Sequence, residues 1–174
     1  MAKLTNSPNI DTLIENLASP YQTIRKRSRD SLVMMGTMAV KPLIELLEHQ
    51  NYHVRWEATK ALGEIGHPAA AVALVKCLED EYLDVRWRAA EDLIAFGQAG
   101  LLPLLQALIA RPRSVRLRQS ALHILRALNL TILHDLTTPI VAALEGVEPA
   151  MNVPHAAHLA LQALPKTGSS PIKH

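Results

Sequence analysis

Apolar side chains recur along this chain with the periodicity of an amphipathic helix. In the stretch that begins at Val54, small or apolar residues occupy positions Ala58, Ala61, Leu62 and Ile65. These positions lie within one stripe of a helix that turns by about 100° per residue. The pattern therefore predicts a helix with one buried face. It excludes a strand, whose side chains alternate between two faces.

A short phrase, an apolar residue followed by arginine, opens four such stretches about thirty residues apart, which is the spacing of a structural repeat. The openings are Ile24-Arg25, Val54-Arg55, Val85-Arg86 and Leu117-Arg118, and the stretches close at Gly36, Gly66, Gly97 and Asn129. Glycine, and sometimes asparagine, supplies the left-handed conformation that commonly ends a helix. The sequence therefore predicts a repeated helix with its own stop.

A second apolar block precedes each of these helices and predicts a partner helix. The blocks are Leu13-Ile14, Leu43-Ile44, Leu74-Val75, Leu104-Leu105 and Ile140-Val141, and Pro42, Pro103 and Pro139 precede three of them. Proline is tolerated at an early helical position, where no N–H is needed, so we expect these prolines there. We predict five helix pairs, the last one atypical because Pro154 replaces the arginine of the phrase.

The wording Val-Arg-x-x-Ala-x-x-Ala-Leu-x-x-x-Gly resembles HEAT repeats, and most of all the subgroup named for phycobilisome (bilin) lyases. The resemblance covers roughly residues 8–165. It implies an all-α fold, a right-handed α-solenoid with the first helices on its convex side and the phrase helices along a concave groove. It implies no particular reaction, because this subgroup includes binding scaffolds, chaperones and a few enzymes.

We expect these pairs to form a single HEAT-like repeat domain over residues 1–166. The approximate repeat units are 8–36, 39–66, 69–97, 100–129 and 137–165. Glycine, serine and proline in residues 167–174 predict a disordered tail. The segment from Val153 to Leu164 has no charged residue, although a terminal helix usually has a polar outer face. This contrast suggests self-association through the last helix pair.

Two tryptophans hold the same position in successive repeats, two residues after the phrase begins, where a side chain should point away from the core into the groove. Exposed aromatic pairs flanked by polar groups are typical of binding hot spots. The predicted partner-binding groove consists of Lys26, Trp56, Glu57, Lys60, Trp87, Arg88, Glu91, Gln119 and His123. The alternative is that each indole packs on the neighbouring helix, beside Tyr52 or Tyr82.

The arginine of the phrase recurs at the flank of each helix, where a guanidinium can bond carbonyls or acids of an adjacent unit. We predict a structural ladder of Arg25, Arg55, Arg86 and Arg118. Asp84 and Glu81 are candidate partners, and the pairing stays open.

Composition narrows the function only slightly. The chain is 49% hydrophobic but 3% aromatic, as expected where leucine, alanine and valine pack helix against helix. A net charge of +2 and a groove of mixed charge do not favour a nucleic-acid partner. The N-terminus shows no apolar signal region, and the longest apolar run, near Leu101 to Ala110, is too short to span a membrane. We expect a cytoplasmic protein without membrane contact.

No residue pattern predicts a catalytic or metal site. Cys77 takes the place that Leu46 and Ala107 hold in neighbouring units, so a small core residue is the favoured interpretation. One HEAT-like enzyme family, deoxyhypusine hydroxylase, builds a di-iron site from His-Glu dipeptides, which this chain lacks. Only His155 and His158 are spaced to share a helix face. We therefore expect no metal, no cofactor and no catalytic residue.

Two classes of function remain open. The favoured one is a non-enzymatic scaffold or adaptor, whose groove binds a helix or an extended segment of another protein. The alternative is a bilin lyase subunit or phycobiliprotein chaperone that binds a linear tetrapyrrole, and it rests on the family resemblance. The chain would be an enzyme only in the second case.

Overall fold

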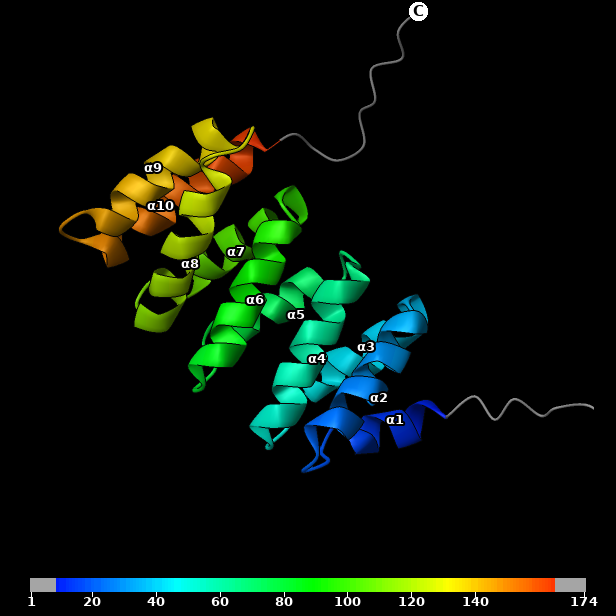
Figure 1. The fold of residues 1–174 in the computed structure, drawn as a ribbon. Coiled ribbons are helices and arrows are strands. Elements are labelled where there is room, and N and C mark those ends of the chain that lie inside the picture. The colour runs from blue at the N-terminus through cyan, green and yellow to red at the C-terminus, as the bar shows by residue number, and fades with distance from the viewer. Residues whose placement is uncertain (1–8, 165–174) are drawn as a thin grey trace, which may run out of the picture. The chain divides into compact units, whose positions relative to one another are not determined.

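The computed structural model describes residues 9–164, and in this range the chain forms ten α-helices and no strands. The helices are α1 (Ile10–Asn16), α2 (Gln22–Met34), α3 (Thr37–Leu46), α4 (Tyr52–Ile65), α5 (Ala70–Cys77), α6 (Leu83–Ala95), α7 (Gln98–Ala110), α8 (Val115–Leu128), α9 (His134–Glu145) and α10 (Pro149–Ala163). The all-α repeat fold with five helix pairs is confirmed (Figure 1).

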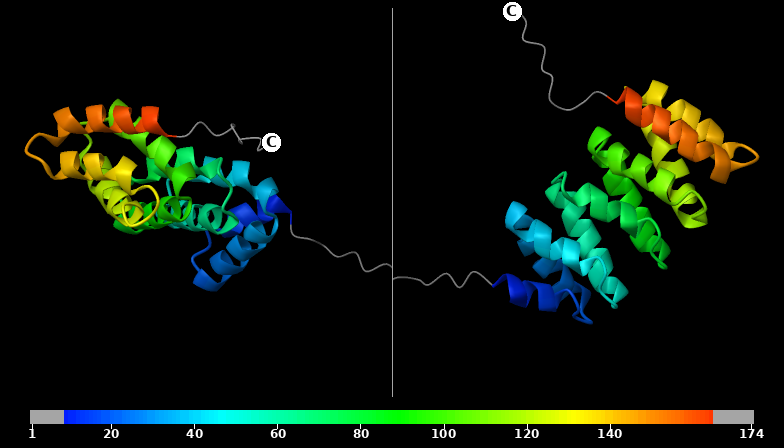
Figure 2. Two further views of the ribbon diagram at one scale, coloured as in Figure 1. Left: turned by 90° about the horizontal axis from the view of Figure 1, so that it is seen from above. Right: turned by 180° about the vertical axis from the view of Figure 1, so that it is seen from behind.

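The helices belong to two compact units that divide at Leu101 and Leu102, within α7, and each unit is described by itself. In the first unit α1, α3 and α5 each pack against the helix that follows them, and α4 packs against both α2 and α6. Helices α2, α4 and α6 of the first unit thus form a row, and Figure 2 shows these helices from two further directions. The single-domain expectation stays a prediction, and the tail at 167–174 lies outside the described residues.

Burial follows the predicted apolar stripe closely. In α4, Val54 is 1% exposed, and Ala58, Ala61 and Leu62 are fully buried. Burial of one leucine side chain stabilises a fold by roughly 1.5–3 kcal/mol. Each helix is therefore stabilised by packing its apolar stripe against the facing helix. Cys77 is 5% exposed, and burial raises the pKa of its thiol to about 12. The thiol therefore stays protonated and packs as a core residue, as predicted.

The glycines that close the first three repeated helices have positive φ, as predicted. Their φ angles are 59° at Gly36, 68° at Gly66 and 56° at Gly97. The same prediction for Asn129 is wrong, because its φ is −63°. Its side-chain oxygen instead accepts hydrogen bonds of 2.8 Å from the hydroxyls of Thr137 and Thr138. Asn129 therefore joins the end of α8 to α9 through its side chain.

The prolines of the first helices lie deeper in their helices than predicted. Pro42 is the sixth residue of α3, and Pro103 and Pro139 are the sixth residues of α7 and α9. These helices begin five residues before the proline, so the apolar blocks mark the middle of each helix and not its start. Proline at this position removes one bond, to the carbonyl four residues earlier.

Candidate binding site

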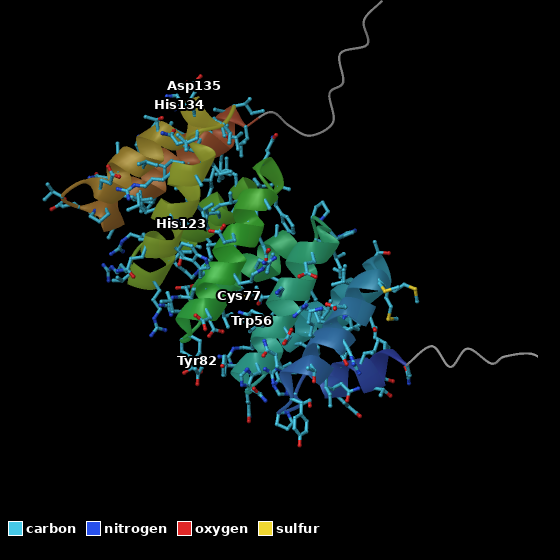
Figure 3. All side chains as sticks on the ribbon, viewed as in Figure 1. Trp56, Cys77, Tyr82, His123, His134 and Asp135 are labelled. Carbon is cyan, nitrogen blue, oxygen red and sulfur yellow. The ribbon has the colours of Figure 1, made fainter. Side chains whose placement is uncertain are left out.

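A cavity of about 510 Å³ lies among the first turns of α2, α4 and α6 in the first unit. Its lining consists of Gln22, Arg25, Tyr52, His53, Trp56, Glu57, Asp84, Trp87 and Arg88. Pockets of roughly 300–1,000 Å³ are typical of sites for small ligands. Both tryptophans line it, and Figure 3 labels Trp56 on α4. The cavity lies where these three helices begin side by side, and its lining comes from equivalent positions of successive repeats.

The two indoles differ in their surroundings. Trp56 is half-buried, and the Lys60 ammonium lies 5.1 Å from the centroid of its ring. Such a cation over an aromatic face is weakly attractive, so Lys60 helps to hold that indole in place. Trp87 is 55% exposed. The cavity therefore has one fixed aromatic wall and one that solvent reaches.

A buried charge cluster forms the wall of the cavity beside Trp56. Glu57 is 1% exposed, and its carboxylate lies 2.7 Å from Arg29 Nη1 and 3.4 Å from Arg25 Nε. Both arginines belong to α2, so this cluster links α2 to α4. Glu57 is thus a buried, ion-paired wall residue and not the exposed groove acid that the sequence predicts.

Arg88 reaches the cavity from α6, and Asp92 of the same helix holds it. Arg88 Nη2 lies 2.6 Å from Asp92 Oδ1 and Arg88 Nε lies 3.1 Å from Asp92 Oδ2. Burial raises the pKa of Asp92 to about 6, although Arg88 acts to lower it. Sequence reasoning did not assign Asp92 to the site. The available signal was an aspartate at an apolar position of the repeat.

The four phrase arginines make one recurrent contact. Each Nη1 donates to a backbone carbonyl six residues earlier, in the turn before its own helix. The acceptors are Ser19 O for Arg25 and His49 O for Arg55 at 2.8 Å, Asp80 O for Arg86 at 2.7 Å, and Pro112 O for Arg118. The guanidinium thereby bonds the turn inside its own repeat, a contact that the sequence prediction did not include.

Arg55 adds contacts with the next repeat. It donates from Nε to Asp80 Oδ2 at 2.7 Å and from Nη2 to Glu81 Oε1 at 3.3 Å. The pair with Asp80 raises the pKa of Arg55 further, so its charge is permanent. Glu81 is therefore a partner of the ladder, whereas Asp84 lines the cavity.

Aromatic stacking joins the starts of α4 and α6. The rings of Tyr52 and Tyr82 stack with 4.5 Å between centroids and 15° between planes. The Arg55 guanidinium lies 5.5 Å from the Tyr82 centroid, and Asp80 accepts a bond of 2.9 Å from the Tyr82 amide. Figure 3 labels Tyr82 in the turn before α6. These contacts fix the edge of the cavity at Tyr52.

The remaining predicted groove residues lie outside the cavity lining. Lys26 is exposed on α2 and pairs with Asp30 at 2.9 Å, and Glu91 is exposed on α6. Gln119 and His123 belong to α8 in the second unit. The structure thus brings together Trp56, Glu57, Trp87 and Arg88 of the predicted set, joined by Arg25.

Three further observations concern metal binding, membrane spans and the exposed side chains of α10. Within residues 9–164 no three His, Cys, Asp or Glu side chains lie together in a way that could hold a metal ion. No helix in this range is long and apolar enough to cross a membrane. On α10, Met151 is 73% and Leu159 51% exposed, and self-association through this helix stays a prediction.

Comparison with known proteins supports the repeat assignment. Residues 10–94 match the family model of HEAT repeats, a range that holds every residue lining the cavity. Phycocyanobilin lyase subunit beta of Pseudanabaena tenuis is 41% identical over 66 residues, which cover 38% of this chain and 23% of that protein. The subunit of the same name from Thermosynechococcus vestitus is 32% identical over 75 residues, 43% of this chain and 35% of that protein.

These matches confirm the resemblance to HEAT repeats and to bilin lyase relatives. The chain spans about a quarter to a third of the length of the curated relatives it matches, at 23% and 35%. The likeness thus concerns a repeat segment.

Proposed function

We propose that this HEAT-repeat chain is a non-enzymatic binding scaffold, and that the tryptophan-lined cavity of its first unit binds a helix or an extended segment of another protein. The observation that carries the proposal is the convergence of Trp56 and Trp87 on one cavity of about 510 Å³. Tryptophan is enriched at the residues that dominate binding energy, because it offers a large contact area and one hydrogen-bond donor.

The contacts of the lining support binding by a preformed site. Arg25 bonds to the turn before α2, Glu57 pairs with Arg29, and Arg88 is held by Asp92. Side chains that are already ordered lose little further entropy when a partner binds. The cavity therefore needs little rearrangement to accept a partner segment.

The test uses a Trp56→Ala, Trp87→Ala double variant as bait in affinity capture. Tyr21→Ala is the matched control, since Tyr21 is a 66% exposed aromatic residue just before α2 and outside the cavity lining. We expect a partner that is retained by the wild type and by the control to be lost by the double variant. A partner retained by the double variant at wild-type yield, with an unchanged circular dichroism spectrum, would contradict the proposal.

A second candidate rests on the names of the relatives. Both are phycocyanobilin lyase subunits, so the cavity could serve a linear tetrapyrrole bound between the indoles. This function predicts that titration with phycocyanobilin changes the absorbance of the pigment with wild-type protein and not with the double variant. An absorbance change equal in both proteins would place pigment binding elsewhere.

A further inference from the structure

The cavity of the first unit has cationic groups on both flanks of Trp56. Arg25 enters its lining from α2 and Arg88 from α6, and both of these helices pack against α4. Arg25 is 9% exposed, and the Arg88 side chain is 30% exposed. Two guanidinium groups beside an indole can receive a planar anion while an apolar neighbour contacts the ring.

The donors of these arginines are only partly used. Asp92 takes the edge of the Arg88 guanidinium that carries Nε and Nη2, and residues 9–164 supply Arg88 with no other side-chain hydrogen bond. Arg25 Nη1 bonds to the carbonyls of Ser19 and Pro20. Within residues 9–164 its Nε has no hydrogen-bond partner, although Glu57 lies 3.4 Å away, and less than 1 Å² of this atom is accessible. An acceptor that enters the cavity therefore meets the open edge of Arg88 and not Arg25 Nε.

The charge balance of the buried wall also favours an anion. One carboxylate, Glu57, serves two buried arginines, Arg25 and Arg29. The other acids near Arg29 are more exposed: Asp30 is also shared with Lys26, and Glu64 lies 3.9 Å from Arg29 Nε. The cluster is thus short of buried negative charge.

Two acids line the cavity beside these arginines. Glu57 is buried and already paired with Arg25 and Arg29, and Asp84 is exposed at the start of α6. Solvent and salt screen an exposed carboxylate far more than a buried guanidinium. The buried groups therefore decide which charge the interior of the cavity prefers.

We propose that this cavity recognises a carboxylate attached to an apolar group. The occupant is an aspartate or glutamate side chain of the partner segment, with its carboxylate at the open edge of Arg88 and its apolar neighbours against Trp56. This inference rests on the proposed scaffold function and names the chemistry of its partner. A propionate of a linear tetrapyrrole offers the same group, and the experiment separates the two sources.

The experiment follows the two indole N–H signals of Trp56 and Trp87 by NMR during titration with blocked peptides. The peptides differ only in a central Glu, Gln or Lys flanked by leucines, so the Glu side chain is the sole carboxylate. We expect the Glu peptide to bind roughly tenfold more tightly than the Gln peptide, as for a hydrogen bond to a charged group. A Gln or Lys peptide that binds as tightly as the Glu peptide overturns the proposal.

The matched variants locate the effect at Arg88. Arg88→Gln is combined with Asp92→Asn, so that no buried carboxylate loses its cation. Arg27→Gln is the control, because Arg27 is exposed on α2 and holds the position in its repeat that Arg88 holds in α6. We expect the first variant to abolish the Glu preference and the control to retain it. A preference that survives in the Arg88 variant overturns the proposal.

A second titration, with pigment, distinguishes an acidic side chain of a partner from a propionate of a tetrapyrrole. Phycocyanobilin and its dimethyl ester are titrated under the same conditions. If no peptide shifts the indole signals while the free pigment does and its ester does not, the partner-segment occupant is overturned. Failure of the peptides leaves the capture result with the Trp56→Ala, Trp87→Ala variant intact, so the scaffold function is judged separately.

Discussion

Two buried ion pairs of the first unit, Arg29–Glu57 and Arg88–Asp92, differ in what they join. Between α2 and α4, Arg29 reaches Glu57 on the neighbouring helix at 2.7 Å, and their side chains are 6% and 1% exposed. Between α4 and α6, Arg88 and Asp92 pair within α6. The first pair ties two repeats together, whereas Asp92 has no bond to the adjacent repeat within residues 9–164, where Arg55 and Asp80 make that connection instead. The comparison distinguishes Glu57, whose charge joins two helices, from Asp92, whose charge is buried without joining its helix to the next repeat.

The largest effect is expected at the α2–α4 boundary. Glu57→Gln keeps the shape of the side chain but leaves Arg25 and Arg29 buried without their shared counter-charge. Removal of one partner of a buried ion pair typically costs about 3–5 kcal/mol of folding free energy. We expect a loss of that size in urea unfolding with an unchanged m-value.

Glu64→Gln is the matched control in the same helix. Glu64 is 35% exposed in its side chain and lies 3.9 Å from Arg29, so its removal should change the free energy of unfolding by roughly 0.5 kcal/mol or less. Equal losses in the two variants would show that Glu57 does not join the helices.

The repeated pattern predicted the helix pairs and the left-handed glycines because each depends on residues close in sequence. The contacts across the boundary could not be predicted in the same way. Glu57 and Arg88 hold the same position in their repeats. Nothing in the sequence around them indicates that Glu57 is buried whereas Arg88 is only half-buried. The environment of Glu57 depends on Arg29, 28 residues earlier. The carbonyls that the phrase arginines share within their own repeats could not be singled out from the sequence, because every residue carries a backbone carbonyl.

A second prediction concerns the α4–α6 boundary, where Gly63 faces Asp92. A Cβ on Gly63 would lie 2.0 Å from Asp92 Oδ1, so Gly63→Ala must displace the Asp92 carboxylate from its place. Overpacking of this kind typically costs about 1–3 kcal/mol. We expect Gly63→Ala to destabilise the wild type by this amount and to cost much less in an Asp92→Ala background.

Gly100→Ala tests whether this relief is specific. A Cβ on Gly100 would lie 2.4 Å from the backbone oxygen of Leu93, which no side-chain substitution can remove. Its cost should therefore be the same with and without Asp92→Ala. If Gly63→Ala is equally harmful in both backgrounds, Asp92 is not the obstacle, and the coupling measured by the double-mutant cycle will be near zero.

The smallest expected effect is a pH dependence of the free energy of unfolding that comes from Asp92. Burial raises the pKa of Asp92 to about 6, above its value in an unfolded chain. The folded state therefore binds more protons than the unfolded state between about pH 4 and pH 6, and the free energy of unfolding falls as pH rises through this window. For this group the fall between pH 5 and pH 7.5 is roughly 1 kcal/mol.

Asp92→Asn carries no charge at either pH, so it should not suffer this loss. We expect the free energy of unfolding of the variant, relative to the wild type, to improve by roughly 1 kcal/mol from pH 5 to pH 7.5, measured by urea unfolding at both pH values. Asp84→Asn removes an exposed carboxyl from the same helix and should leave the wild-type loss in place. A variant that instead becomes relatively less stable at pH 7.5 would mean that the Asp92 carboxylate contributes more through Arg88 than its burial costs. The Arg88–Asp92 pair would then stabilise the fold as the Glu57 cluster does.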